Sequence, residues 1–149
     1  MAWEFILFDI PSMLAGADMS GTNGGTTEGY QSTAQFLFAK LSAADTVVPC
    51  AALTDAAIGV IQTNPKAGSG YSNVGVEVRQ LGVSKVVAAA ALAVGTFVGA
   101  DANARAVARV LTASGGDAGH WVNGVILEAT NNAGELATML LMSPFILQS

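Results

Sequence analysis

The chain alternates short apolar runs with glycine, asparagine and proline, and this pattern predicts β-strands. Beyond residue 34 the runs are three to eight residues long and rich in β-branched and aromatic side chains, which favour strands. Between residues 74 and 79 a valine stands at every second position, as in a half-buried strand. We predict nine strands, at residues 35–41, 46–50, 57–62, 74–81, 83–89, 96–98, 105–112, 121–128 and 135–142.

The environment of some strands can also be predicted. Residues 135–142 (ELATMLLM) are apolar on both faces, which indicates a central strand between two layers or a strand at a subunit contact. The preceding residues 131–134 (NNAG) tolerate positive φ angles and predict a hairpin turn, and residues 64–68 (NPKAG) predict another turn.

Two alanine-rich stretches, 87–94 and 102–113, leave room for one short helix. Asp101 could cap a helix that begins after it, and Arg105 and Arg109 have the i, i+4 spacing of neighbours on a helix. The predicted class is therefore all-β, a compact β-sandwich or β-barrel domain with an extended N-terminal arm and at most one short helix.

The N-terminal residues 1–10 are apolar on both sides of an extended chain, so we expect them to be buried. One side carries Trp3, Phe5 and Leu7, and the other carries Ile6, Phe8 and Ile10. Pro11 is expected to end this strand because proline has no N–H to donate. The region that follows is rich in Gly, Ser and Thr. We therefore predict an arm at 1–15, a connector at 16–34 and a β-rich domain at 35–149.

The composition suggests that part of the surface is buried against other molecules. A chain of 149 residues suits one domain, and 52% of its residues are hydrophobic while only 11% are charged. So few charges would poorly cover a lone monomer, so we expect self-association.

Net charge and cysteine content narrow the classes of partner. The formal net charge is −5 and the six Lys and Arg residues are scattered, so we expect no nucleic-acid partner. No apolar run approaches the roughly 18 residues that span a bilayer, and the N-terminus lacks a basic signal-peptide region, so we expect no membrane partner. The single cysteine, Cys50, excludes an intrachain disulfide.

Candidate chemistry is sparse. A nucleophilic pair of Cys50 and His120, assisted by Asp55 or Asp117, is conceivable, but nothing in the sequence brings these residues together. The other carboxylates are spread over turns and strand ends, and Cys and His do not cluster as zinc ligands do. We therefore expect no catalytic, cofactor-binding or metal residues, and expect that the protein is not an enzyme. Trp3, Tyr30, Tyr71 and Trp121 could form a sugar-binding platform, but they are not clustered in the sequence.

From about residue 34 to residue 141 the chain resembles the bacteriophage head decoration, or capsid cement, proteins. The matching segments are 59–61 (GVI), 64–68 (NPKAG), 74–76 (VGV), 81–82 (LG), 91–98 (ALAVGTFV) with Asp101, 124–129 (GVILEA) and 134–135 (GE). Where such proteins have a glycine after the Asp–Ala–Asn stretch, this chain has Ala104, so the local turn could be rebuilt or drawn into a helix.

The resemblance implies a structural virion protein, made in the host cytoplasm, that binds the outer surface of a phage capsid as a homotrimer. It would stabilise contacts between copies of the major capsid protein. We hypothesise that the arm residues make the capsid or subunit contact; they are Trp3, Phe5, Ile6, Leu7 and Phe8. The alternatives are another minor capsid, neck or tail protein, a carbohydrate-binding module, and a small hydrolase around Cys50 or a serine.

Overall fold

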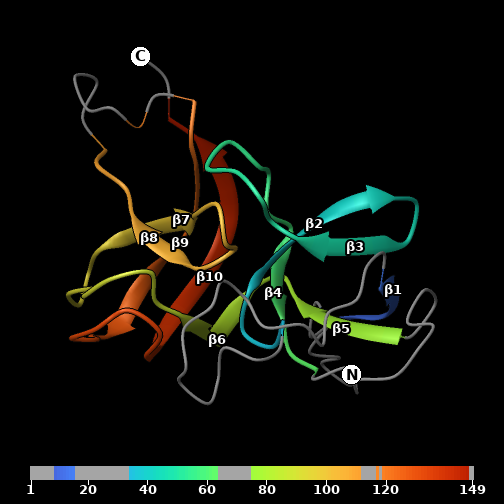
Figure 1. The fold of residues 1–149 in the computed structure, drawn as a ribbon, viewed down its shortest axis with the longest axis horizontal. Coiled ribbons are helices and arrows are strands. Elements are labelled where there is room, and N and C mark those ends of the chain that lie inside the picture. The colour runs from blue at the N-terminus through green and yellow to red at the C-terminus, as the bar shows by residue number, and fades with distance from the viewer. Residues whose placement is uncertain (1–8, 16–33, 64–74, 112–116, 118, 148–149) are drawn as a thin grey trace, which may run out of the picture.

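The computed structural model describes residues 9–15, 34–63, 75–111, 117 and 119–147. These ranges contain ten β-strands and no helix (Figure 1). The strands are β1 (Asp9–Ala15), β2 (Phe38–Ala43), β3 (Thr46–Pro49), β4 (Gly59–Ile61), β5 (Gly75–Arg79), β6 (Gly82–Val87), β7 (Phe97–Ala100), β8 (Ala106–Ala108), β9 (Trp121–Glu128) and β10 (Leu136–Ile146). The all-β prediction is confirmed, and each of the nine predicted strands overlaps an observed one.

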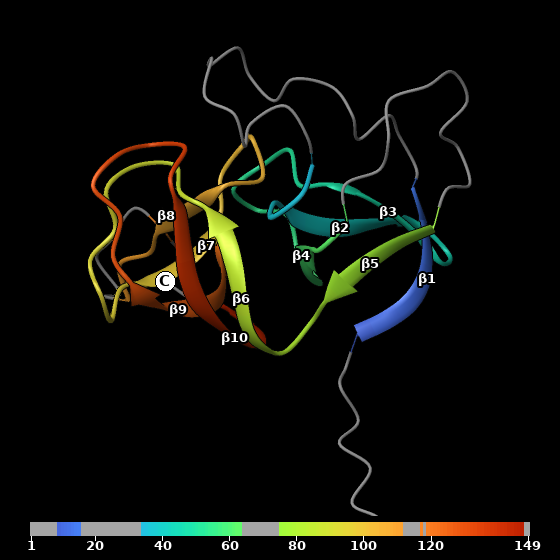
Figure 2. The ribbon, with the colours of Figure 1, turned by 90° about the horizontal axis from the view of Figure 1, so that it is seen from below.

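The strands form two sheets that lie side by side in both ribbon views (Figures 1 and 2). The first is a closed barrel in the order β1-β3-β2-β4-β5, closed by the antiparallel pair of β1 and β5. The second is a five-stranded sheet in the order β6-β10-β9-β7-β8. The chain passes from β5 to β6 through Gln80 and Leu81 alone, so these residues connect the two sheets.

The burial pattern follows the two-residue period that the sequence predicts. In β5, Val76 and Val78 are buried while Glu77 and Arg79 are partly exposed, which confirms the half-buried strand. β10 pairs with β6 on one side and β9 on the other, so it is central in its sheet as predicted. Only one of its faces is buried, through Ala137, Met139 and Leu141, while Leu140 on the other face is exposed. The largest buried side chains come from both sheets, and include Leu37, Phe38, Val60, Ile61, Val86, Ile126 and Met139.

The predicted turn between β9 and β10 is also confirmed, and the Glu135 carboxylate holds it. Glu135 Oε2 accepts the backbone N–H of Asn131 at 2.7 Å and that of Asn132 at 3.2 Å, while Oε1 accepts the Asn132 side-chain amide at 2.8 Å. Gly134 has a φ of 86°, which glycine adopts without strain. The turn predicted at 64–68 lies outside the described residues.

The predicted helix is wrong for the described parts of both alanine-rich stretches. Asp101 does cap backbone groups, because its Oδ1 accepts the N–H of Asn103 at 2.8 Å and that of Arg105 at 2.7 Å. These bonds close a tight turn, and the chain then enters β8 instead of a helix. Ala104 completes the turn with a φ of 62°. The turn is thus kept, with alanine in the left-handed conformation that glycine prefers.

The N-terminal region differs from the prediction in one respect. β1 does not end before Pro11 but runs through it, and its register with β5 shifts between Ile10 and Met13. A proline fits a strand at such an irregularity because no ladder hydrogen bond is required of it there. Residues 9–15, assigned to the arm from the sequence, therefore form a strand of the barrel. The predicted connector at 16–34 falls almost wholly outside the described residues.

Replacing Ala104 by glycine tests the strain in this turn. A left-handed backbone costs an alanine roughly 1–2 kcal/mol, and glycine relieves this strain. The relief offsets two losses that the substitution brings, which are the lost burial of the methyl group and the greater flexibility of glycine. We expect Ala104→Gly to leave the free energy of unfolding nearly unchanged in urea denaturation. The control, Ala106→Gly in the buried start of β8, has no such relief and should cost about 1 kcal/mol more. Equal losses of unfolding free energy in the two variants would show that the backbone at Ala104 is not strained.

Candidate functional site

A buried arginine ties the two sheets together. Arg109 follows β8 directly and is only 5% exposed. Its Nη2 donates to the carbonyl of Ala100 at 2.6 Å and to that of Leu53 at 3.3 Å, and its Nε donates to the carbonyl of Trp121 at 3.3 Å. Leu53 belongs to the segment that leaves the barrel after β3, while Ala100 and Trp121 belong to the second sheet. The guanidinium therefore fixes the junction.

Asp117 and His120 flank this arginine. Asp117 Oδ1 lies 4.0 Å from Arg109 Nη1 and 3.0 Å from His120 Nδ1, and Oδ2 accepts the N–H of Val110 at 2.7 Å. The Val110 hydrogen bond is the main reason that the pKa of Asp117 lies below its usual value; burial opposes it, and His120 and Arg109 assist it. Burial in turn lowers the pKa of the Arg109 guanidinium, which the carboxylates of Asp117 and Asp101 counteract. The cluster is a charge-balanced structural network.

The segment between β3 and β4 is held at two further points. Burial would raise the pKa of Asp55, but the Lys40 ammonium at 2.7 Å and the N–H groups of Ala51 and Ala52 outweigh it, so the pKa is lowered. Asn123, buried in β9, donates its Nδ2 to the carbonyl of Ala57 at 3.0 Å. The segment therefore keeps a fixed position against β9.

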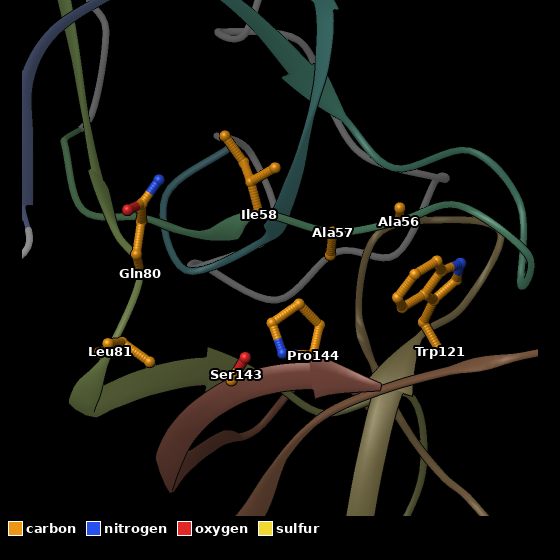
Figure 3. A pocket seen from close by; sticks show the side chains of 8 residues that line it. All are labelled: Ala56, Ala57, Ile58, Gln80, Leu81, Trp121, Ser143 and Pro144. Carbon is orange, nitrogen blue, oxygen red and sulfur yellow. The ribbon is translucent and has the colours of Figure 1, made fainter. Parts of the chain in front are cut away.

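A pocket of about 360 Å³ opens at this junction (Figure 3). One wall comes from the barrel side and the other from β9 and β10; the lining residues are Ala56, Ala57, Ile58, Gln80, Leu81, Trp121, Ser143 and Pro144. None of these described residues carries a charge, and the polar side-chain groups among them are the Gln80 amide, the Ser143 hydroxyl and the Trp121 indole N–H. The pocket can take an apolar side chain, but its lining supplies neither a nucleophile paired with a base nor a charged group.

A second apolar feature is a row of side chains across the second sheet. The strand register places Val83 of β6 opposite Leu140 of β10, Leu140 opposite Val125 of β9, and Val125 opposite Phe97 of β7. Directly opposed residues of antiparallel strands share one face. Val83 is 51% exposed and Leu140 39% exposed, while Val125 and Phe97 are partly exposed. We call these four residues the apolar row.

A polar row lies beside it on the same sheet. Lys85 of β6 donates its Nζ to Glu128 Oε2 at 2.9 Å and to Thr138 Oγ1 at 2.7 Å. Thr138 of β10 also donates to Glu128, and the hydrogen bonds from Thr138 and then Lys85 lower the pKa of the Glu128 carboxyl. The charges on this face therefore satisfy one another, and the neighbouring apolar row stays unpaired within the described structure.

No hydrogen bond joins the two described residues of the candidate catalytic pair, Cys50 and His120. Cys50 is buried, and burial together with the Asp55 charge raises the pKa of its thiol to about 12, so it carries its proton at neutral pH. The His120 ring nitrogen Nδ1 lies 3.0 Å from Asp117 Oδ1. Within the described residues, no group of three or more His, Cys, Asp or Glu side chains is placed to hold a metal ion. No helix in those same ranges could cross a membrane.

The predicted contact residues Trp3, Phe5, Ile6, Leu7 and Phe8 lie outside the described residues, as do Tyr30 and Tyr71 of the proposed sugar platform. Trp121, the remaining ring of that platform for which a position is described, lines the pocket. Sequence reasoning missed Arg109, which was paired with Arg105 on a helix. Arg105 instead binds Asp101, with its Nη2 at 2.9 Å from Oδ2. A lone arginine within the apolar run AVARVL was the available signal.

Comparisons with known proteins give one weak likeness. No protein-family model matches the sequence, and no curated protein is significantly similar to it. The chain is similar to a crystal structure described as the head fiber gp8.5 N base in bacteriophage phi29, with 16% identity and a TM-score of 0.48. The match covers 73% of this chain and 82% of that one. A likeness of this strength supports no conclusion about function.

Truncating the buried arginine tests its role at the junction. Arg109→Ala leaves the buried Ala100 carbonyl and two less buried carbonyls without this donor, and Asp117 without the buried cation. We therefore expect the free energy of unfolding to fall by about 3–5 kcal/mol. Arg105→Ala is the matched control, because that arginine forms a partly exposed pair worth about 1 kcal/mol or less. Urea denaturation followed by circular dichroism measures both. Similar losses of unfolding free energy in the two variants would show that Arg109 does not hold the junction of the two sheets.

Proposed function

We propose that this protein is a structural virion protein that binds the outer surface of a phage capsid as a homotrimer and stabilises contacts between major capsid proteins. The observation that carries the proposal is the apolar row of Val83, Leu140, Val125 and Phe97, which offers an uncharged, regular surface on four adjacent strands. Exposed contiguous apolar surface of this kind marks sites of protein association.

The strand edges favour association of subunits through the face of the second sheet over the addition of a strand at an edge. The barrel is closed, so its strands leave no free edge. At the edge strand β6, the Val83 carbonyl accepts Arg79 Nη1 at 2.8 Å, and the Val87 N–H donates to the Phe36 carbonyl at 3.0 Å. With these edge groups already bonded, the sheet face is the better surface for contact with another subunit.

The sparse charge of the chain and its resemblance to head decoration proteins point the same way. A partner that binds only the assembled shell shifts the equilibrium away from disassembly, and repetition around the shell adds avidity. Neither step requires catalysis.

The oligomer is tested by placing a charge in the apolar row. Leu140→Lys puts an ammonium at the middle of the row, on a side chain exposed enough for the fold to tolerate it. We expect light scattering to give a trimer for the unmodified protein and a monomer for this variant, because burying an unpaired charge is costly. Leu41→Lys is the control, since Leu41 is 51% exposed on β2 and outside the row, and it should remain trimeric. A monomeric unmodified protein, or a trimeric Leu140→Lys, would refute the interface.

Binding to heads is tested by sedimentation with phage heads stripped of their small surface proteins. We expect the unmodified protein to co-sediment with the heads and raise their melting temperature. Deleting residues 1–8 should abolish co-sedimentation and leave the trimer intact, if the apolar arm makes the capsid contact. The deletion stops at residue 8 because Asp9 already pairs with Arg79 in the barrel. Undiminished binding by the deleted protein would eliminate the arm as the contact, and no binding by either protein would eliminate the capsid role.

A further inference from the structure

The apolar pocket at the junction has no part in the proposed capsid contact, and its position relative to the start of β1 is informative. β1 runs antiparallel to β5, with Asp9 opposite Arg79 and Ile10 opposite Val78. The two residues that follow Arg79 are Gln80 and Leu81, and both line the pocket. Asp9, the first residue of β1, therefore lies beside the end of β5 that leads into the pocket wall.

The direction of the ladder defines which residues could reach the pocket. In an antiparallel pair, the chain before one residue runs alongside the chain after its partner. Continued by one and two residues, the ladder would set Phe8 across from Gln80 and Leu7 across from Leu81. Each residue of an extended chain spans about 3.3 Å, so residues 1–8 are long enough to cross the pocket mouth.

The chemistry of the segment matches that of the pocket. Residues 1–8 read MAWEFILF and contain one charged side chain, Glu4, among aromatic and aliphatic ones. The pocket is lined by the Trp121 indole, the Pro144 ring and aliphatic side chains, and its polar side-chain groups are the Gln80 amide, the Ser143 hydroxyl and the indole N–H (Figure 3). Aromatic side chains supply large apolar contact area in such a pocket.

We infer that this pocket is the docking site of the N-terminal segment, residues 1–8, of the same chain. A segment docked in this pocket would cover Trp121, which lines it. A capsid or a neighbouring subunit that takes up the segment must compete with this pocket for it. The inference concerns the free protein and does not depend on the proposed capsid role.

The two tryptophans of the chain allow a direct test. Trp3→Phe leaves Trp121 as the single tryptophan, and deletion of residues 1–8 does the same. Acrylamide quenching then reports the exposure of Trp121 in both proteins, without any phage head. We expect the quenching constant to be higher in the deleted protein, with emission shifted to longer wavelength. A synthetic peptide with the sequence of residues 1–8 should lower the quenching constant of the deleted protein again.

Substitutions at the pocket wall provide the matched control. In the Trp3→Phe background, Leu81→Asp should raise the quenching constant to that of the deleted protein, because it places a carboxylate in the apolar lining. Leu81 is 42% exposed, so the fold should survive, and a urea denaturation curve verifies this. Leu41→Asp, an exposed leucine outside the pocket, should leave the quenching constant unchanged.

Two outcomes overturn the inference. Equal quenching of Trp121 in the Trp3→Phe and deleted proteins would show that residues 1–8 do not cover the pocket. Protection that disappears on dilution would assign the pocket to a segment or surface of another copy. Because no heads are present, failure here is distinguishable from failure of the capsid proposal, which the sedimentation experiment addresses separately.

Discussion

The arrangement of the two sheets depends on how the Arg109 guanidinium is satisfied. A buried cation costs several kcal/mol unless hydrogen bonds and a counter-charge compensate it. Here the carbonyls come from the segment after β3, from β7 and from β9, and Asp117 supplies the charge. Gly99 makes the arrangement sterically feasible, because a Cβ there would collide with the Trp121 carbonyl and lie 2.9 Å from Arg109 Nε. One side chain thus fixes three backbone segments at once.

The structure of this junction determines which surfaces are available to a partner. The fixed segment between β3 and β4 provides Ala56, Ala57 and Ile58 as one wall of the pocket, and β9 provides Trp121 as the other. The barrel is closed, and both edge strands of the second sheet are bonded in part: Val83 O and Val87 N of β6 pair with Arg79 and Phe36, and Ala106 O of β8 accepts the Ala89 N–H. What remains for partners is side-chain surface: the pocket at the junction and the apolar row on the second sheet. Both sites use β9 and β10, because Trp121, Ser143 and Pro144 line the pocket while Val125 and Leu140 belong to the apolar row.

Local signals made much of the fold predictable. Strands such as β5 follow from a two-residue alternation, and the β9–β10 turn follows from Asn131, Asn132 and Gly134, because each depends on neighbours in sequence. Arg109 was misplaced because its i, i+4 spacing from Arg105 suits a helix, whereas its real partners lie 9, 12 and 56 residues away. The pocket was equally hidden, since its walls come from four separated segments. Spacing along the chain carries no information about such contacts.

The high apolar content and low charge can now be assigned to particular places. Apolar side chains that pack in the two sheets account for the core, and Lys85, Thr138 and Glu128 satisfy one another beside the apolar row. If residues 1–8 cover the pocket, the row is the larger apolar surface left to explain the scarcity of charge. If they leave the pocket to bind a partner, Trp121 and Pro144 become exposed together with it. The cost of that exposure opposes release, so a partner must offer the segment a more favourable apolar contact than the pocket does.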